Sequence, residues 1–235
     1  MEEYKNDLGQ PIGFPISDWQ ACERPPQTIM RGNYCRVETL DIDKHAEDLY
    51  QAFGTDKDHS NWTYLMKGPF EEFADFKAWL IEYASSNDPH FHTVFDLKTE
   101  KPVGIATFMR IEPVMGIIEV GNIHFSPLMQ RTPLSTEALY LMMKRVFDEL
   151  GYRRYEWKCD SLNAPSCNAA KRLGFTPEGV FRQLMMYKSR NRDTAWFSII
   201  DSEWPILKSM FEAWLAPSNF DASCKQISSL QSFKG

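Results

Sequence analysis

The segment from Asn163 to Gly179, NAPSCNAAKRLGFTPEG, constrains the fold most, because it carries the signals of a short helix enclosed by two strands. Asn163 or Ser166 can cap this helix, and Pro165 fits its first turn. Gly174 ends it. A helix in this setting is expected to offer free backbone N–H groups that can bind a phosphate. A capped helix without a ligand is the alternative explanation.

The composition fits one folded domain with extensions. The chain has 235 residues, of which 43% are hydrophobic, so it can bury a full core. A formal net charge of −6 argues against a broad surface for nucleic acid or anionic membrane and leaves room for a local anion site. No signal segment follows Met1 and no apolar run could span a bilayer. We therefore expect a cytoplasmic protein, with the nucleus as the open alternative.

The cysteine pattern predicts free thiols in a reducing compartment and no metal site. The cysteines are odd in number, lack metal-type spacing and do not cluster with histidines. They are Cys22, Cys35, Cys159, Cys167 and Cys224. Covalent catalysis through an acyl-cysteine is disfavoured, because no histidine lies near Cys159 or Cys167 in the sequence to activate the thiol.

Hydrophobic periodicity predicts an α/β chain built around an antiparallel meander. Prolines and glycines interrupt residues 1–31, which we expect to form an irregular arm with Trp19 as an anchor. The predicted strands cover 34–39, 92–97, 102–111, 116–125, 154–159, 179–187 and 194–200. Predicted helices begin at 41 or 43, cover 71–83 and 135–150, and begin again near 202. Residues 217–235 are expected to form a polar tail.

The order of Asn163, Ser166, a small-residue helix, Leu-Gly-Phe and Glu-Gly resembles the C-terminal motif of the GNAT superfamily of acyl-CoA-dependent N-acyltransferases. Within it, the chain resembles the branch of ribosomal-protein-alanine N-acetyltransferases. The resemblance runs from about Gly32 to Trp204 and implies a domain over residues 32–216. It also implies a GNAT-type fold with a mixed, mostly antiparallel central sheet of about six to seven strands and helices on both faces.

The segment from Gln130 to Ala138 occupies the place of the GNAT pyrophosphate loop, Gln/Arg-x-x-Gly-x-Gly/Ala. Pro133 stands at the first glycine and supplies no N–H, so a neighbour must replace one phosphate contact. The resemblance implies acetyl-CoA as cosubstrate, with its pantetheine arm paired to strand backbone. The expected cofactor-binding residues are Ile123, His124, Phe125, Gln130, Arg131, Leu134, Ser135, Thr136 and Asn163. An ordinary polar loop before a capped helix is the alternative.

Amide formation from a thioester needs a base for the amine proton and a proton donor for the leaving thiolate. Glu119 lies where many relatives carry a carboxylate and is the leading candidate base, directly or through water. A glutamate bonded to nearby backbone or turned to solvent is the alternative. Ser166 matches the serine that the ribosomal-protein branch places near the sulphur, which makes it the candidate acid. Asp160 is a further candidate base, and no metal is required.

The acceptor pocket is less sharply indicated. Candidates to line it precede the second helix or lie on the final hairpin, and core packing is the alternative for each. They are Trp62, Tyr64, Tyr187, Asp193 and Trp196. The strand from Phe181 to Tyr187 lacks the carboxylate expected in ribosomal-protein enzymes, which weakens the case for a ribosomal substrate.

The sequence therefore predicts an enzyme that moves an acetyl group from acetyl-CoA to a primary amine by direct attack in a ternary complex. The acceptor is a small molecule, a peptide or a protein N-terminus, with no nucleic-acid or membrane partner and with a homodimer left open. A non-catalytic acyl-CoA-binding or scaffold protein is the alternative, motivated by Pro133. A nucleic-acid-binding module using Lys188, Arg190 and Arg192 conflicts with the acidic chain, and a solvated hairpin explains these residues better.

Overall fold

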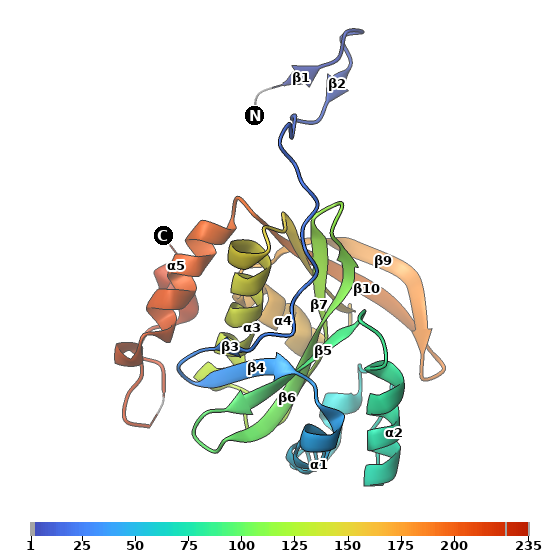
Figure 1. The fold of residues 1–235 in the computed structure, drawn as a ribbon, viewed down its shortest axis with the longest axis vertical. Coiled ribbons are helices and arrows are strands. Elements are labelled where there is room, and N and C mark those ends of the chain that lie inside the picture. The colour runs from blue at the N-terminus through green and yellow to red at the C-terminus, as the bar shows by residue number, and fades with distance from the viewer. Residues whose placement is uncertain (1–2, 224, 235) are drawn as a thin grey trace.

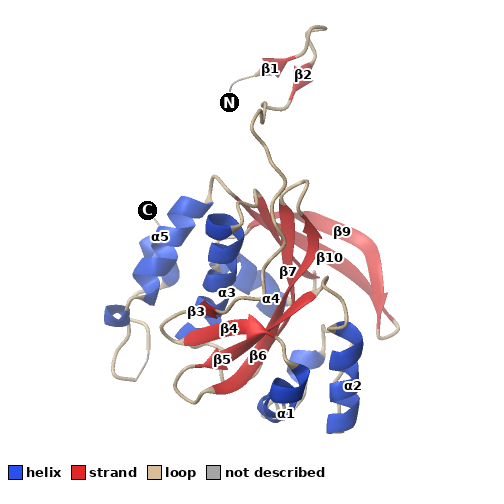
Figure 2. Ribbon diagram, in the orientation of Figure 1, coloured by secondary structure: helices blue, strands red, loops and turns tan. Residues whose placement is uncertain are grey.

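The computed structural model describes residues 3–223 and 225–234, so Cys224 lies outside the described residues. An eight-stranded sheet carries helices on both of its faces (Figures 1 and 2). The strand order is β3-β4-β5-β6-β7-β8-β10-β9. Neighbouring strands are antiparallel except β7 and β8, which run parallel. The predicted mixed, mostly antiparallel sheet is confirmed.

The elements follow the predicted order. The strands are β3 (Met30–Arg31), β4 (Cys35–Thr39), β5 (His90–Asp96), β6 (Lys101–Glu112), β7 (Ile117–Phe125), β8 (Arg154–Asp160), β9 (Thr176–Tyr187) and β10 (Arg190–Ile200). The helices are α1 (Ile42–Phe53), α2 (Phe73–Tyr83), α3 (Pro133–Lys144), α4 (Ala164–Arg172) and α5 (Trp204–Leu215). A π-helical turn, Arg145–Glu149, continues α3, and 3-10 turns cover Ser60–Trp62, Pro217–Asn219 and Leu230–Phe233. The sheet exceeds the expected strand count because the two-residue β3 pairs with β4.

Each face of the sheet buries its own core. Helices α1 and α2 pack on β5 and β6 through a cluster that includes Leu49, Phe76 and Ile105. On the opposite face, α3, α4 and α5 cover a larger cluster that includes Ile118 and Tyr155. We call these the α1 face and the α3 face. None of the described helices is long and apolar enough to cross a membrane.

Both ends of the chain contact the sheet or its helices. The N-terminal arm starts with the small hairpin of β1 (Tyr4–Lys5) and β2 (Pro11–Ile12), which lies away from the sheet (Figure 1). Further along the arm, the Trp19 indole N–H donates to the Val114 carbonyl at 2.8 Å. Near the other terminus Leu230 is fully buried, and Gln226 accepts a hydrogen bond from the Trp214 indole at 2.9 Å. Trp19 is therefore bonded to the turn between β6 and β7.

Glu137 joins α3 to the start of the sheet. Its buried carboxylate accepts backbone N–H groups of Asn33 and Tyr34, each at 2.7 Å, and of Cys35 at 2.8 Å. Gly32 lies so close that a Cβ there would meet the carboxylate at 2.3 Å. Three N–H donors around one charged acceptor hold the turn between β3 and β4 on the helix.

Replacing Glu137 with alanine should lower the free energy of unfolding by about 3 kcal/mol, because one buried and two part-buried N–H groups would lose a charged acceptor. Urea denaturation of the purified variant measures this loss. Glu82→Ala, at an exposed position of α2, is the matched control and should change stability by less than about 0.5 kcal/mol. A loss below about 1 kcal/mol for Glu137→Ala would contradict the anchoring role.

Candidate functional site

Strands β7 and β8 begin as neighbours and then separate. They pair only from Ile117 to Val120 on β7 and from Arg154 to Trp157 on β8. Beyond these pairs β7 stays bonded to β6, and β8 stays bonded to β10. The facing edges of residues 121–125 and 158–160 therefore have no ladder partner in the described part of the chain. Unpaired backbone groups of this kind can bind an extended ligand as an added strand.

A β-bulge in β7 lies where the strands separate. Thr107 pairs with Gly121 and Ile105 with His124, so β7 has one extra residue between these pairs. Asn122 adopts a φ of 46°, in the left-handed region. The Thr107 hydroxyl donates to the Gly121 carbonyl at 3.0 Å. After the bulge Ile123 packs against the α3-face core, whereas His124 contacts rings of the α1 face.

The His124 side chain is buried between two aromatic rings. Its ring centroid lies 3.9 Å from that of Phe53 and 4.0 Å from that of Trp62. Neither ring nitrogen has a hydrogen-bond partner among the described residues. Burial lowers the pKa of His124 to about 3, so the imidazole is neutral at pH 7. Only the backbone of His124 is therefore positioned at the free edge of β7.

The N-terminus of α3, where the sequence predicts a phosphate site, has two N–H donors without a partner in the helix. Because α3 begins at Pro133, the N–H groups of Leu134 and Ser135 have no intrahelical partner. No side chain caps them, since the Ser135 hydroxyl donates to the Thr132 carbonyl at 2.9 Å. Thr136 is less available, because its hydroxyl accepts from the Arg172 guanidinium at 3.0 Å. The exposed Arg131 precedes the helix and forms no ion pair with the described residues.

Gln130 forms two hydrogen bonds that order the loop before α3. Its amide nitrogen donates to the Phe125 carbonyl at 2.8 Å and to the Asn61 side chain at 3.0 Å. The loop is thereby tied both to the end of β7 and to the segment between α1 and α2. Gln130 orders the loop through these two bonds.

The N-terminus of α4 does not offer free N–H groups, and this expectation was wrong. The Asn163 side chain accepts the Ser166 N–H at 3.1 Å, and the Leu162 carbonyl accepts the Ala164 N–H at 2.9 Å. Pro165 has no N–H to donate. Asn163 therefore caps the helix, and of these two helices α3 is the one whose first N–H groups lack a side-chain cap.

Ser166 and Cys167 on α4 contact side chains of β8 next to its unpaired edge. The Ser166 hydroxyl oxygen accepts from the Trp157 indole at 3.0 Å, and the same hydroxyl hydrogen-bonds the Cys159 side chain. The sulphur atoms of Cys159 and Cys167 lie 3.5 Å apart. Burial raises the pKa of Cys159 to about 12, so its thiol stays protonated at neutral pH.

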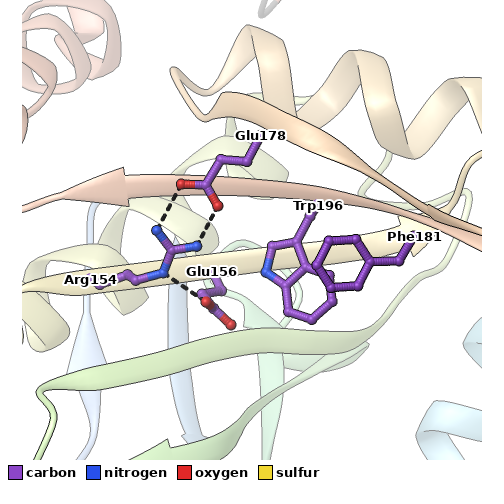
Figure 3. Close-up of a pocket in the computed structure, with 5 residues that line it drawn as sticks. All are labelled: Arg154, Glu156, Glu178, Phe181 and Trp196. Carbon is purple, nitrogen blue, oxygen red and sulfur yellow. Dashed lines mark hydrogen bonds and ion pairs between the residues drawn. The ribbon is translucent and has the colours of Figure 1, made fainter. Parts of the chain in front are cut away.

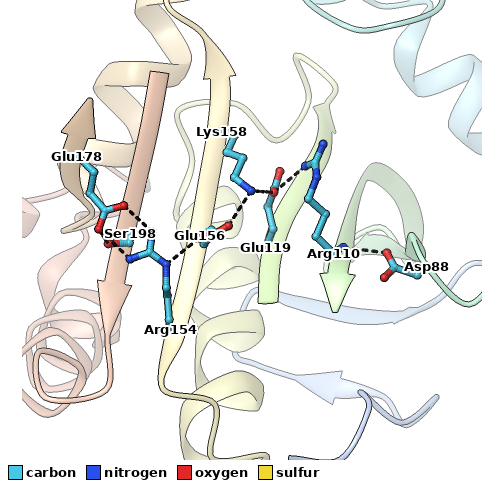
Figure 4. A network of polar contacts seen from close by, with 8 residues as sticks. All are labelled: Asp88, Arg110, Glu119, Arg154, Glu156, Lys158, Glu178 and Ser198. Carbon is cyan, nitrogen blue, oxygen red and sulfur yellow. Dashed lines mark hydrogen bonds and ion pairs between the residues drawn. The ribbon is translucent and has the colours of Figure 1, made fainter. Parts of the chain in front are cut away.

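Glu119 lies in a chain of ion pairs on the α1 face (Figure 4). Its carboxylate, 3% exposed, lies 2.7 Å from the Arg110 guanidinium and 2.8 Å from the Lys158 ammonium. Lys158 also lies 2.7 Å from Glu156. Arg154 continues the chain from Glu156 to Glu178. Each member of this chain of ion pairs therefore has a partner of opposite sign.

A hollow of about 270 Å³ adjoins this chain on the outer strands (Figure 3). The Lys158 ammonium lies 3.9 Å from the Trp196 ring centroid, and Trp196 lies 4.3 Å from Phe181. The hollow is lined by Arg154, Glu156, Glu178, Phe181 and Trp196. It lies beside Lys158 and away from the pyrophosphate loop. Of the predicted acceptor residues, Trp196 lines it.

We call the space between the separated ends of β7 and β8 the gap, and the loop of residues 54–72 between α1 and α2 the connecting loop. The connecting loop forms hydrogen bonds with residues that follow β8 and with the hairpin of β9 and β10. The Tyr64 hydroxyl donates to the Leu162 carbonyl at 3.1 Å. Lys188 donates to the Trp62 carbonyl at 2.7 Å, and Arg190 to the Thr63 carbonyl at 2.9 Å. The Trp62 ring itself is buried in the α1-face core.

Tyr187 and Asp160 form a buried pair at the end of β8. The Tyr187 hydroxyl donates to the Asp160 carboxylate at 2.7 Å. Burial, together with this carboxylate, raises the pKa of Tyr187 to about 12. Asp193 lies apart from this pair and binds its own hairpin through the Gln183 backbone and the Asn191 side chain.

The sequence did not single out Lys158 or Arg110. A signal for Lys158 was present, because β8 reads RYEWKCD, with charged residues at alternate positions and apolar ones between them. Since alternate residues share a face, these charges had to lie together on one side of the sheet. Arg110 had no comparable signal, since it lies in a second irregularity of the strand register, directly after Met109, which pairs with Glu119.

The family model for the GNAT acetyltransferase domain (Acetyltransf_3) matches residues 36–176. A GCN5-related N-acetyltransferase structure from Brucella melitensis is 46% identical, with a TM-score of 0.91 and coverage of 93% of this chain and 99% of that one. A probable GNAT-family acetyltransferase from Chromobacterium violaceum is 38% identical, with a TM-score of 0.78 and coverage of 83% and 98%. An acetyl transferase from Salmonella typhimurium, described as modifying the N-terminal serine of ribosomal protein L7/L12, shares the fold at 19% identity, with a TM-score of 0.62 and coverage of 74% and 99%. No curated protein matches.

The neutral state of His124 predicts a loss of stability in mild acid. Its pKa of about 3 in the folded chain lies below the ordinary value of 6.5, so the unfolded chain binds the proton first as the pH falls. The stabilisation is complete above pH 6.5 and declines as the pH falls toward 3. At pH 5 the loss due to His124 should be about 2 kcal/mol.

Urea denaturation of the wild type and of His124→Phe at pH 7 and pH 5 tests this. The variant should lose about 2 kcal/mol less than the wild type between the two pH values. An equal loss in both proteins would show that His124 does not stay neutral in the folded state.

Proposed function

Because this chain belongs to the GNAT family of acetyltransferases, we propose that it transfers an acetyl group from acetyl-CoA to a primary amine. The observation that carries the proposal is the gap between β7 and β8, together with the uncapped N-terminus of α3 beside it. Backbone groups along one edge and N–H donors at its end fit a molecule with amide groups and a pyrophosphate. This ligand chemistry is that of coenzyme A.

The chain's own residues fit such a cosubstrate. The backbone from Ile123 to Phe125 faces the gap and supplies partners for amide groups. The Leu134 and Ser135 N–H groups and the exposed Arg131 supply donors and charge for phosphate. Asn163 holds the start of α4 beside the end of β8. Pro133 removes one donor and leaves these others in place. This supports a loop that can still bind coenzyme A.

The acceptor amine would attack the thioester directly, which requires a base and an acid in the gap. We assign the proton from the amine to Glu119, reached through water, because its carboxylate lies on β7 just before the strands separate. Arg110 and Lys158 hold this carboxylate in one position. We assign protonation of the departing thiolate to Ser166, whose hydroxyl would turn from the Cys159 side chain to donate to the thiolate.

The acceptor would enter from the α1 face. Tyr64 on the connecting loop, Tyr187 on the hairpin and Trp196 in the hollow lie along this side of β8. We propose a small-molecule or peptide amine as acceptor and the cytoplasm as compartment, with a homodimer left open. Membership of the ribosomal-protein-alanine branch stays a prediction. A non-catalytic acyl-CoA-binding protein is the alternative, and binding of acetyl-CoA without turnover would favour it.

Arg131→Glu should abolish binding of acetyl-CoA, because it places a negative charge where the phosphates are expected. Isothermal titration with acetyl-CoA and with desulfo-CoA measures this directly. Arg31→Glu, exposed on β3, reverses an equal charge away from the gap and should leave the affinity unchanged. Unchanged affinity in Arg131→Glu would remove Arg131 from the site.

Glu119→Gln should lower kcat by about 100-fold while binding of acetyl-CoA persists, because the amide cannot accept the proton. Release of the CoA thiol in the presence of a panel of primary amines measures turnover. Glu47→Gln, exposed on α1, is the matched control. A kcat within threefold of the wild type would exclude Glu119 as the base.

A further inference from the structure

Four cations of the hairpin formed by β9 and β10 form no ion pair with a carboxylate within the described residues. They are Arg182, Lys188, Arg190 and Arg192. On the same sheet Arg110, Arg154 and Lys158 are each paired with a glutamate. Asp193 is the nearest carboxylate in the sequence to Lys188, Arg190 and Arg192. It bonds the Gln183 backbone and the Asn191 side chain, and of the four cations it is Arg182 whose charge helps to lower its pKa. In a chain with a net charge of −6, this concentration of unpaired positive charge is unusual.

These cations lie next to the end of β8. The guanidinium carbons of Arg190 and Arg192 lie 5.2 Å and 6.0 Å from the Tyr187 ring centroid. Tyr187 in turn donates to Asp160. Lys188 and Arg190 also contact backbone carbonyls of the connecting loop, which leaves their charge uncompensated. Burial and the neighbouring Arg190 charge lower the pKa of Lys188, which indicates that the cations repel one another.

Two buried polar atoms in this region lack partners. The Nε atom of Arg192 and the hydroxyl of Thr194 have no hydrogen-bond partner among the described residues. Thr194 lies directly opposite Asp160 in the register of β10 with β8, so the two side chains share a face. Buried donors are normally satisfied, and both of these atoms can donate to an oxygen. Thr194 is only 1% exposed, so a ligand with carboxylate oxygens would pair with the half-buried guanidinium of Arg192 and not with the Thr194 hydroxyl.

We propose that the acceptor is the free N-terminus of an acidic peptide, whose carboxylates contact Arg190 and Arg192. This inference rests on the proposed acetyl transfer and adds the substrate class to it. The amine would reach the gap past Asp160, while the acidic side chains that follow it would neutralise the hairpin. Polyamines and lysine-rich peptides would be repelled by the same cations.

Binding of three pentapeptides tests the inference. All have a free N-terminal alanine, and their next three residues are aspartate, asparagine or lysine. Titration in the presence of desulfo-CoA, which cannot react, gives a Kd for each. The aspartate peptide should bind about tenfold tighter than the asparagine peptide at low salt, and the difference should shrink at high salt. The lysine peptide should bind weakest.

An R190S/R192S variant should reduce the preference for aspartate over asparagine to less than twofold. R192Q keeps the contact of Arg190 with the connecting loop and should reduce the preference for aspartate partly. This single variant replaces the double variant in the test if the double variant unfolds. R31S, at the opposite edge of the sheet, should keep the full preference.

The outcomes separate the inference from the proposed function. Equal affinity for the three peptides, or a preference for lysine, would overturn the inference whatever the turnover. Free aspartate that binds as tightly as the aspartate peptide would overturn the assignment to a peptide. A preference for aspartate that depends on Arg190 and Arg192, without thiol release from acetyl-CoA, would support the inference and reject acetyl transfer.

Discussion

The separation of β7 from β8 is the constraint on which the rest of the site depends. Parallel strands normally continue their hydrogen-bond ladder, and here the ladder stops after Val120 and Trp157. The extra residue at the Asn122 bulge shifts which side chains of β7 face each core, so that beyond the separation His124 is buried and Ile123 is partly buried. The backbone of both strands stays bonded on its outer side. Pairing with β6 and β10 therefore fixes the positions of β7 and β8 on either side of the gap. The backbone groups that face the gap remain available to a ligand.

Charge is distributed unequally along the face that adjoins this gap. From Arg110 to Glu178 positive and negative side chains alternate, and each is within ion-pair distance of the next. Such a network costs desolvation energy and is stable only when every member is paired. The hairpin beyond Tyr187 has no such balance. Because a buried network with full pairing has little to offer a charged ligand, electrostatic recognition of an acceptor falls to the unpaired hairpin.

The sequence predicted those parts of the structure that depend on local signals. Asp41 caps α1 through a bond to the Lys44 N–H, and Gly174 follows α4 with a φ of 96°, as residues of these types favour. Alternation and turns gave the strand order in the chain. The sequence could not locate the bulge at Asn122, because its position is set by pairing with β6. For the same reason the pairs of Glu119 with Lys158 and of Tyr187 with Asp160 required the fold, since their partners lie 39 and 27 residues apart in the chain.

Pro133 shows how a departure from a family pattern can keep the physical function. A glycine at that position would offer an N–H and conformational freedom, and proline offers neither. At the first position of a helix, however, the lost N–H is one that the helix itself does not use. The fixed φ of proline favours the start of α3 and so orients the N–H groups of Leu134 and Ser135 that follow. The loop thus exchanges one donor for a more rigid helix start, and the exposed Arg131 next to it can compensate for the lost donor with a full charge.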